Sequence, residues 1–229
     1  MSFRSTLLAA VAVIGASTSA FAAPVDWASP SGSQPTFDYQ QGQSQTGKFS
    51  DGIGLPNGFA LFPSNFSAVA PQGQTLSQQV GDTLSVILNA KPNHVIKSIT
   101  SSLLGDYSIL GRGEVDSSGQ LRVTNLDTMQ VLSSNFTYNG LPAATHSSLE
   151  GKWDGGTAIN LPAGWKNVKV EVDGLVSAYT DSTESTALID AKVANVGVET
   201  AVVPLPAAVF AAPAALVVAY RARRKMARK

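Results

Sequence analysis

Alternating hydrophobic and polar residues dominate the middle of the chain and predict β-strands. The clearest example is Val168-Lys-Val170-Glu-Val172, where every second residue is apolar and the intervening ones are charged. This period of two places one set of side chains in a core and the other in solvent. The same type of pattern predicts strands at 83–88, 95–103, 107–110, 131–138, 187–189 and 193–198.

Turn-forming residues separate these segments. Asp116-Ser-Ser-Gly119 lies between Glu114-Val115 and Leu121-Arg-Val123, which predicts a hairpin with its tip at residues 116–119. Residues 23–50 are rich in Ser, Gln, Gly and Pro, and by composition they resemble a flexible arm, although Thr36–Tyr39 also fits a short strand. Many short strands without a helical period predict an all-β fold. Within that class we expect an antiparallel β-sandwich with a jelly-roll-like topology over residues 23–200.

The first 22 residues have the three parts of a secretory signal peptide. Arg4 supplies positive charge, residues 7–16 form an apolar run of ten residues, and Ala20-Phe21-Ala22 is an A-x-A cleavage site followed by Ala23. The run is too short to span a bilayer, which needs about 20 residues. We therefore predict cleavage after Ala22 and export of the remaining chain.

Residues 201–229 form a second targeting segment. No charged residue occurs between Ala201 and Tyr220, and the basic residues Arg221, Arg223, Arg224 and Lys225 follow. A helix from Leu205 to Tyr220 would be about 24 Å long, slightly less than the bilayer core of about 30 Å. We expect a short transmembrane helix, and the basic residues stop its transfer and keep the C-terminus in the cytoplasm.

Charge and cysteine content exclude several functions. The net charge of zero hides an acidic middle: residues 23–200 hold nine Lys and Arg residues against sixteen Asp and Glu residues, a net charge of −7. An acidic domain repels phosphate backbones, so no nucleic-acid partner is expected. The chain has no Cys, which excludes disulfides and thiolate chemistry.

The C-terminal motif carries a resemblance to a known sorting system. Val203-Pro204-Leu205-Pro206-Ala207, followed by the apolar stretch and the Arg-rich end, resembles the PEP-CTERM sorting signal in its VPLPA-CTERM variant. The resemblance implies recognition by an exosortase-like membrane protease or transpeptidase. It also implies an inner-membrane-anchored precursor that loses its tail and reaches the cell surface or extracellular matrix.

A second resemblance covers the middle of the chain. A series of short fragments is similar to the β-rich ectodomains often attached to PEP-CTERM tails, and it implies architecture without a transferable activity. The fragments are Phe37-Asp-Tyr39, Gly42-Gln-Ser44, Gly47-Lys-Phe49, Phe62-Pro-Ser-Asn-Phe66, Gly81-Asp-Thr-Leu84 and Gly105-Asp-Tyr107.

Candidate catalytic residues are few. His94 and His146 stand outside any recognisable catalytic or zinc-binding motif, so we expect no catalytic residues, metal site or cofactor. Glu171 and Asp173 share a strand face and could form the carboxylate pair of a glycosidase. Because Val168, Val170 and Val172 already occupy the core face, a solvated outer face is the preferred interpretation. The loop Asp181–Glu184 is too short to supply the six to eight oxygen ligands of calcium.

Trp153 and Trp165 are the candidate glycan contacts. Both lie beside glycines, and an exposed indole could stack on a sugar, whereas the ordinary alternative is a Trp that caps the core with its N–H paired. The preferred hypothesis is a non-enzymatic surface or matrix protein whose β-domain has a structural or adhesive role in an exopolysaccharide-bearing envelope, with exopolysaccharide as a candidate partner. A carbohydrate-binding module is the alternative, and a secreted hydrolase ranks last.

Overall fold

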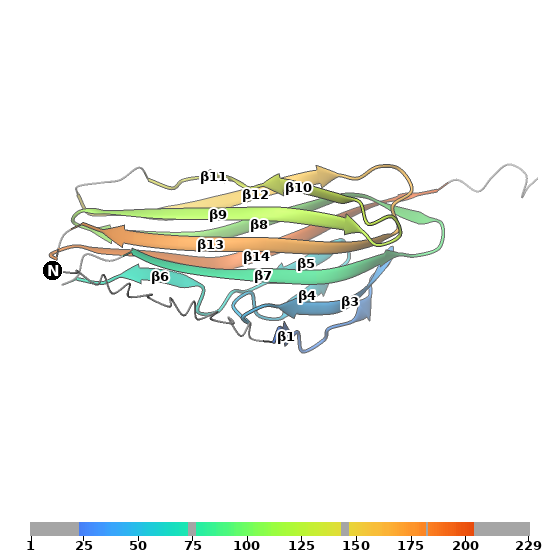
Figure 1. Cartoon of the computed structure of the whole chain (residues 1–229), viewed down its shortest axis with the longest axis horizontal. Helices are drawn as coiled ribbons and strands as arrows, with labels where there is room; N and C mark the ends of the chain where they lie inside the picture. Colours follow the sequence, from blue (N-terminus) through green and yellow to red (C-terminus); the bar gives the residue numbers. More distant parts are fainter. Residues whose placement is uncertain (1–22, 73–76, 143–146, 182, 204–229) are drawn as a thin grey trace, which may run out of the picture.

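Two antiparallel β-sheets lie face to face and form a sandwich in the computed structural model (Figure 1). The structure describes residues 23–72, 77–142, 147–181 and 183–203, and every regular element in these ranges is a strand. The expectation of an all-β, antiparallel sandwich is confirmed.

Sheet A has the strand order β1-β3-β7-β13-β9-β10, with β2 paired to β3. Its strands are β1 (Val25–Asp26), β2 (Gly32–Ser33), β3 (Phe37–Ser44), β7 (Ser77–Ala90), β13 (Asn167–Thr180), β9 (Gly113–Asn125) and β10 (Val131–Asn135).

Sheet B has the order β11-β12-β8-β14-β5-β4, with β6 paired to β14. Its strands are β11 (Thr137–Asn139), β12 (Leu149–Asn160), β8 (His94–Leu110), β14 (Thr186–Val202), β5 (Gly58–Leu61), β4 (Gly52–Leu55) and β6 (Ser67–Ala70).

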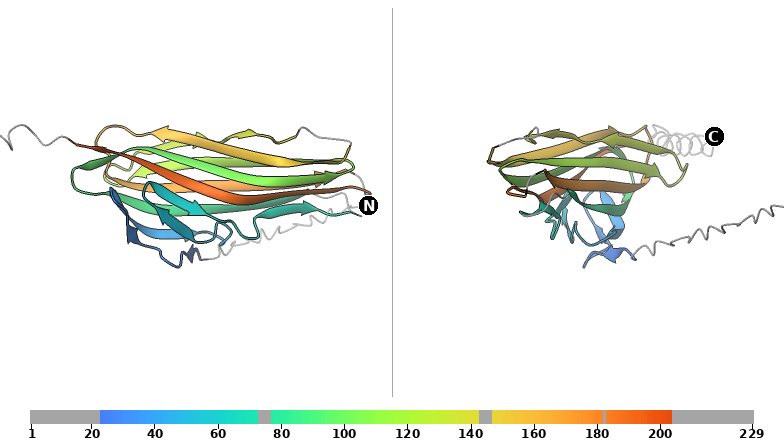
Figure 2. Two further views of the ribbon diagram at one scale, coloured as in Figure 1. Left: turned by 180° about the vertical axis from the view of Figure 1, so that it is seen from behind. Right: turned by 60° about the vertical axis from the view of Figure 1, so that its left-hand side comes forward.

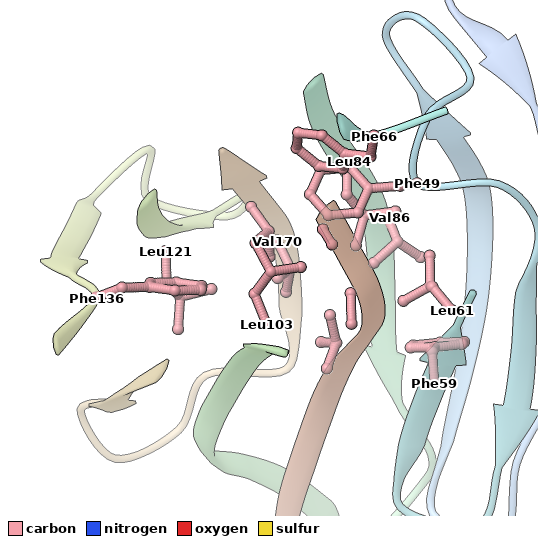
Figure 3. Packing of buried hydrophobic residues seen from close by; sticks show 14 of the residues in the cluster. Phe49, Phe59, Leu61, Phe66, Leu84, Val86, Leu103, Leu121, Phe136 and Val170 are labelled. Atoms are coloured by element: carbon pink, nitrogen blue, oxygen red, sulfur yellow. The ribbon is translucent and has the colours of Figure 1, made fainter. Parts of the chain in front are cut away.

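The core lies between the sheets and follows the alternation seen in the sequence. On β13, Val168, Val170 and Val172 are buried, while the intervening charged side chains face outward. Leu84 and Val86 of β7 face the same core, which Leu103 of β8 enters from sheet B (Figure 3). Each buried aliphatic side chain contributes about 1.5–3 kcal/mol relative to an exposed one, so this interface is the main source of stability.

Two pairs of predicted short strands are single long strands. β8 runs through both 95–103 and 107–110, and β14 runs through both 187–189 and 193–198 with a bulge between Ala191 and Val193. Gly105 does not interrupt β8. A Cβ atom there would lie 1.9 Å from the backbone oxygen of Asp190 and 2.7 Å from Trp153 Nε1, so glycine is needed at this position.

The predicted hairpin at Asp116–Gly119 is wrong. These residues lie in the middle of β9, which pairs without interruption with β13 from Gly113↔Thr180 to Asn125↔Val168. Long-range pairing to β13 therefore overrides local turn chemistry. The turn comes after the strand, where Asn125 Oδ1 accepts hydrogen bonds from the backbone N–H groups of Asp127 (2.8 Å) and Thr128 (3.1 Å).

The Gln-rich segment near the N-terminus is folded, which contradicts the flexible-arm interpretation and supports the predicted strand at Thr36–Tyr39. Phe37 and Tyr39 of β3 are buried, and Trp27 is buried beside them. The Trp27 ring lies 5.5 Å from that of Phe59, measured between ring centroids. Aromatic packing thus orders this segment despite its polar composition.

The chain crosses repeatedly between the sheets. The connections β7–β8, β8–β9, β12–β13 and β13–β14 each lead from one sheet to the other, and Figure 2 shows the two layers from behind and obliquely. The β8–β9 corner consists of Gly111, at φ 82°, and Arg112. Arg112 N–H donates to Ser185 Oγ (2.8 Å) and its guanidinium lies 3.2 Å from Asp181, so this corner is attached to the β13–β14 loop.

A buried carboxylate organises the segment after β3. Asp82 of β7 is 6 % exposed, and its oxygens accept backbone N–H groups from Thr46 (2.8 Å), Lys48 (2.8 Å) and Phe49 (2.9 Å). The Asp82 carboxylate also accepts hydrogen bonds from the Ser44 hydroxyl and from the backbone N–H of Thr83. The fragments 42–44, 47–49 and 81–84, separate in the sequence, therefore meet at one carboxylate.

The last strand ends beside the predicted tail. β14 continues to Val202, two residues beyond the predicted boundary at residue 200, and Val203 N–H donates to Asn93 O (2.8 Å). Among the described residues, no helix is long and apolar enough to cross a membrane. Many targeting residues lie outside the described ranges: Ala20, Ala22, Pro204, Leu205, Pro206, Ala207, Arg221, Arg223, Arg224 and Lys225.

We predict that Asp82→Asn lowers the free energy of unfolding by about 2–3 kcal/mol, because an amide group would face the N–H donors of Lys48 and Phe49 and leave them unsatisfied. Urea denaturation followed by Trp fluorescence measures the change. Asp106→Asn, on the exposed face of β8, is the matched control and should cost less than about 0.5 kcal/mol. Equal stability of the two variants would contradict the role given to Asp82.

Candidate functional site

The two tryptophans predicted to contact glycans are buried. Trp153 is 2 % exposed and Trp165 is 5 % exposed, so neither presents a face to a sugar, and the exposed-platform interpretation is wrong. Trp153 points from β12 into the space between the sheets, and its ring lies 5.9 Å from that of Tyr138. Its Nε1–H has no hydrogen-bond partner among the described residues, so the expected pairing of the indole is also missing.

The other candidate residues are dispersed. His94 Nδ1 lies 3.1 Å from Pro92 O at the start of β8, and His146 lies outside the described residues. Asp181 is paired with Arg112 at the β8–β9 corner. The described residues contain no group of three or more His, Asp or Glu side chains placed to hold a metal ion.

Glu171 and Asp173 lie on the outer face of sheet A, as the alternation predicts, and both are paired. Lys169 Nζ lies 2.7 Å from Glu171, and the Arg122 guanidinium lies 3.7 Å from each carboxylate. The Thr83 hydroxyl donates to Asp173 (2.7 Å). The preferred outer-face interpretation is confirmed, and the carboxylates are held by cations from two strands instead of facing one another across a cleft.

This polar network continues across sheet A. Arg122 also donates to Gln120 Oε1 (3.2 Å), and Gln120 Nε2 donates to Asn135 Oδ1 (3.0 Å) on β10. Side-chain contacts therefore link β7, β13, β9 and β10 on the outer face. We call these residues the polar row: Thr83, Gln120, Arg122, Asn135, Lys169, Glu171 and Asp173.

A groove of about 300 Å³ opens beside the polar row. Its floor is formed by Ser85 of β7, where β3, β7 and β13 run side by side (Figure 1). Ser85 is only 7 % exposed, and its hydroxyl makes no hydrogen bond with any described residue. We call this feature the sheet A groove, and it is lined by Pro24, Gln43, Gln45, Thr83, Ser85, Lys169 and Glu171.

A second groove, of about 400 Å³, lies over β5, β8 and β14 on sheet B. Leu55 and Pro56 form an apolar wall, and Asn57 and Asn195 contribute amides. Asn195 Nδ2 lies 3.4 Å from Ser102 Oγ. We call this feature the sheet B groove.

A third hollow, of about 490 Å³, lies beside Phe136 and Tyr138. The Tyr138 hydroxyl is buried and has no hydrogen-bond partner among the described residues. Neighbouring Ser117 donates to Leu175 O (3.1 Å) instead. Burial raises the pKa of Tyr138 to about 12, because ionisation would place an anion in a poorly solvated site.

Sequence reasoning missed the residues that line the sheet A groove. Gln43 and Ser85 are 42 residues apart in the chain and face each other only because β3 pairs with β7 (Gln43↔Ser85). The one sequence feature that pointed to the region was the cluster of glutamines around residues 40–45, which suggested a disordered arm. Alternation identifies the exposed face of each strand but not which strands become neighbours.

Comparisons with known proteins leave this chain without an assigned family. No family model and no curated protein matches it. Among solved structures, TmCBM61 in complex with β-1,4-galactotriose is 10 % identical, with 74 % of this chain and 95 % of that chain covered and a TM-score of 0.21. The N-terminal cellulose-binding domain of Cellulomonas fimi β-1,4-glucanase C is 10 % identical, with 64 % and 80 % covered and a TM-score of 0.18.

We predict that Tyr138→Phe leaves stability at pH 7 unchanged or raises it by up to about 1 kcal/mol, because it removes an unsatisfied buried hydroxyl. The raised pKa adds a pH dependence: the wild type keeps its full stability below about pH 10 and loses about 1–2 kcal/mol as the pH rises toward 12. Urea denaturation between pH 7 and pH 11.5 should show this loss in the wild type alone. If the free energy of unfolding changes with pH in the same way for both proteins, the raised pKa of Tyr138 is contradicted.

Proposed function

We propose that this chain is a non-enzymatic, exported surface or matrix protein whose β-sandwich has a structural or adhesive role. In this proposal the signal peptide directs export and is removed before Ala23. A short C-terminal helix then anchors the precursor in the inner membrane. An exosortase-like membrane enzyme recognises Val203-Pro204-Leu205-Pro206-Ala207, and the protein reaches the surface without its tail.

The observation that carries this proposal is the position of the last strand. β14 ends at Val202, the residue before Val203, which begins the motif, and this end lies at one end of the long axis of the sandwich (Figure 1). Cleavage within or after the motif would leave all fourteen described strands intact.

The dimensions of the sandwich support a structural role. Six of the described strands have 12–17 residues, whereas strands in globular proteins have about 5–6. At about 3.3 Å per residue, β8 and β14 are each about 55 Å long. Connections that cross between the sheets join the two layers at both ends of these long strands, which favours a stiff body over a hinged one.

The strand order also supports the finer prediction of a jelly-roll-like topology. Sheet B contains the order β12-β8-β14-β5, and sheet A contains β3-β7-β13-β9. Successive strands along the chain alternate between these sets, as the strands of a rolled-up β-ribbon do.

Substitution of the motif prolines tests the sorting step. We predict that Pro204→Ala/Pro206→Ala in the native host leaves the protein in the membrane fraction with its tail attached, whereas the wild type is shortened and reaches the surface. Immunoblots of membrane, surface and medium fractions distinguish the two.

The chain offers a matched control for that experiment. Leu161-Pro162-Ala163 repeats the tripeptide Leu205-Pro206-Ala207 in the loop between β12 and β13. Pro162→Ala should be processed as the wild type is. Normal shortening of the Pro204→Ala/Pro206→Ala variant would contradict sorting through this motif.

A further inference from the structure

We propose that the sheet A groove binds a neutral polysaccharide chain. The inference rests on the proposed placement of the domain at the cell surface and names a binding partner for it. The site differs from Trp153 and Trp165, which are buried.

The polar groups that line the groove match the hydroxyls of a sugar. Amide side chains come from Gln43 and Gln45, and hydroxyls come from Thr83 and Ser85. Amides and hydroxyls both donate and accept hydrogen bonds, as sugar hydroxyls do. The volume of about 300 Å³ lies at the lower end of the range of ligand sites in proteins.

Several polar side chains of the groove make no hydrogen bond with the described part of the chain. The Ser85 hydroxyl lines the groove and makes no hydrogen bond with any described residue; it is not one of the fully buried polar atoms that lack a partner, so it is open to solvent. The side chains of Gln43 and Gln45 likewise make no hydrogen bond with the described part of the chain. These hydroxyl and amide groups therefore keep their hydrogen-bonding capacity for a ligand, whose hydroxyls can replace solvent there.

The charge of the groove favours an uncharged ligand. Lys169 and Glu171 are the charged residues of the groove, and they form an ion pair of 2.7 Å. The groove is therefore close to neutral, while residues 23–200 carry a net charge of −7. An anionic polymer would be repelled by the domain and would find no free cation in the groove, so uncharged sugars fit better.

The shape of the groove favours an extended ligand. The groove opens on a sheet face and continues into the polar row through Thr83, Lys169 and Glu171, which belong to both. A chain of sugars lying across β3, β7 and β13 can extend along this row toward Arg122. A polymer therefore gains contacts that a monosaccharide lacks, which favours a polysaccharide as ligand.

Affinity electrophoresis of the full-length protein tests the proposal. The protein is purified in a detergent without a sugar headgroup and run in native gels that contain hydroxyethyl cellulose, galactan or dextran, with polygalacturonate as the anionic comparison. We expect at least one neutral polymer to retard the wild type. Gln43→Ala/Gln45→Ala and Ser85→Ala should each weaken this retardation, the double variant by about tenfold in Kd, because it loses hydrogen bonds to the sugar.

Asn57→Ala/Asn195→Ala in the sheet B groove is the matched control and should be retarded as the wild type is. Thermal melting of each variant confirms that it is folded. Absence of retardation by all three neutral polymers, retardation by polygalacturonate alone, or equal retardation of the Gln43→Ala/Gln45→Ala variant and the wild type would overturn the proposal. Tail processing is read from the mass of the protein, so a failure of sorting is distinguished from a failure of the groove.

Discussion

The carboxylate of Asp82 is the contact on which the N-terminal third of the described domain depends. A buried charge is tolerated only where hydrogen-bond donors surround it, and the donors come from Ser44, Thr46, Lys48 and Phe49. This contact fixes the segment after β3 on β7. It places Phe49 in the core against Phe66, with ring centroids 5.2 Å apart (Figure 3), and it holds the groove residues Gln43 and Gln45 on the outer face. One interaction therefore supports both the core and the sheet A groove.

Alternation made the fold class predictable, because burial on one face selects the side chains of a strand directly. Val168, Val170 and Val172 illustrate this, and so does the position of Glu171 on the opposite face. The uninterrupted length of the strands was not predictable. Gly105 and Asp116–Gly119 have the local chemistry of breaks and turns, but pairing with distant strands keeps β8 and β9 extended. The groove was missed for a related reason, since strand neighbours bring Gln43, Ser85 and Lys169 together from three parts of the chain.

The same architecture relates the proposed roles to each other. Core side chains occupy the space between the sheets, including both tryptophans that the sequence offered as candidate glycan contacts. The polar row and the sheet A groove therefore lie on the outer face of sheet A, while buried polar groups such as Asp82 are hydrogen-bonded within the fold. In the proposed function, the long strands give a stiff body, the outer face of sheet A supplies adhesion, and the segment after Val202 controls delivery. Each role uses a different part of the chain, so substitutions can separate them.

The intact mass of the protein recovered from the surface and medium of its native host tests the central claim most directly, namely that the sandwich between two removable ends is the mature product. The account predicts a species that begins at Ala23 and ends near Pro204. A species that begins at Ala23 but retains Lys229 would contradict tail removal, and one that retains Met1 would contradict export through a cleaved signal peptide.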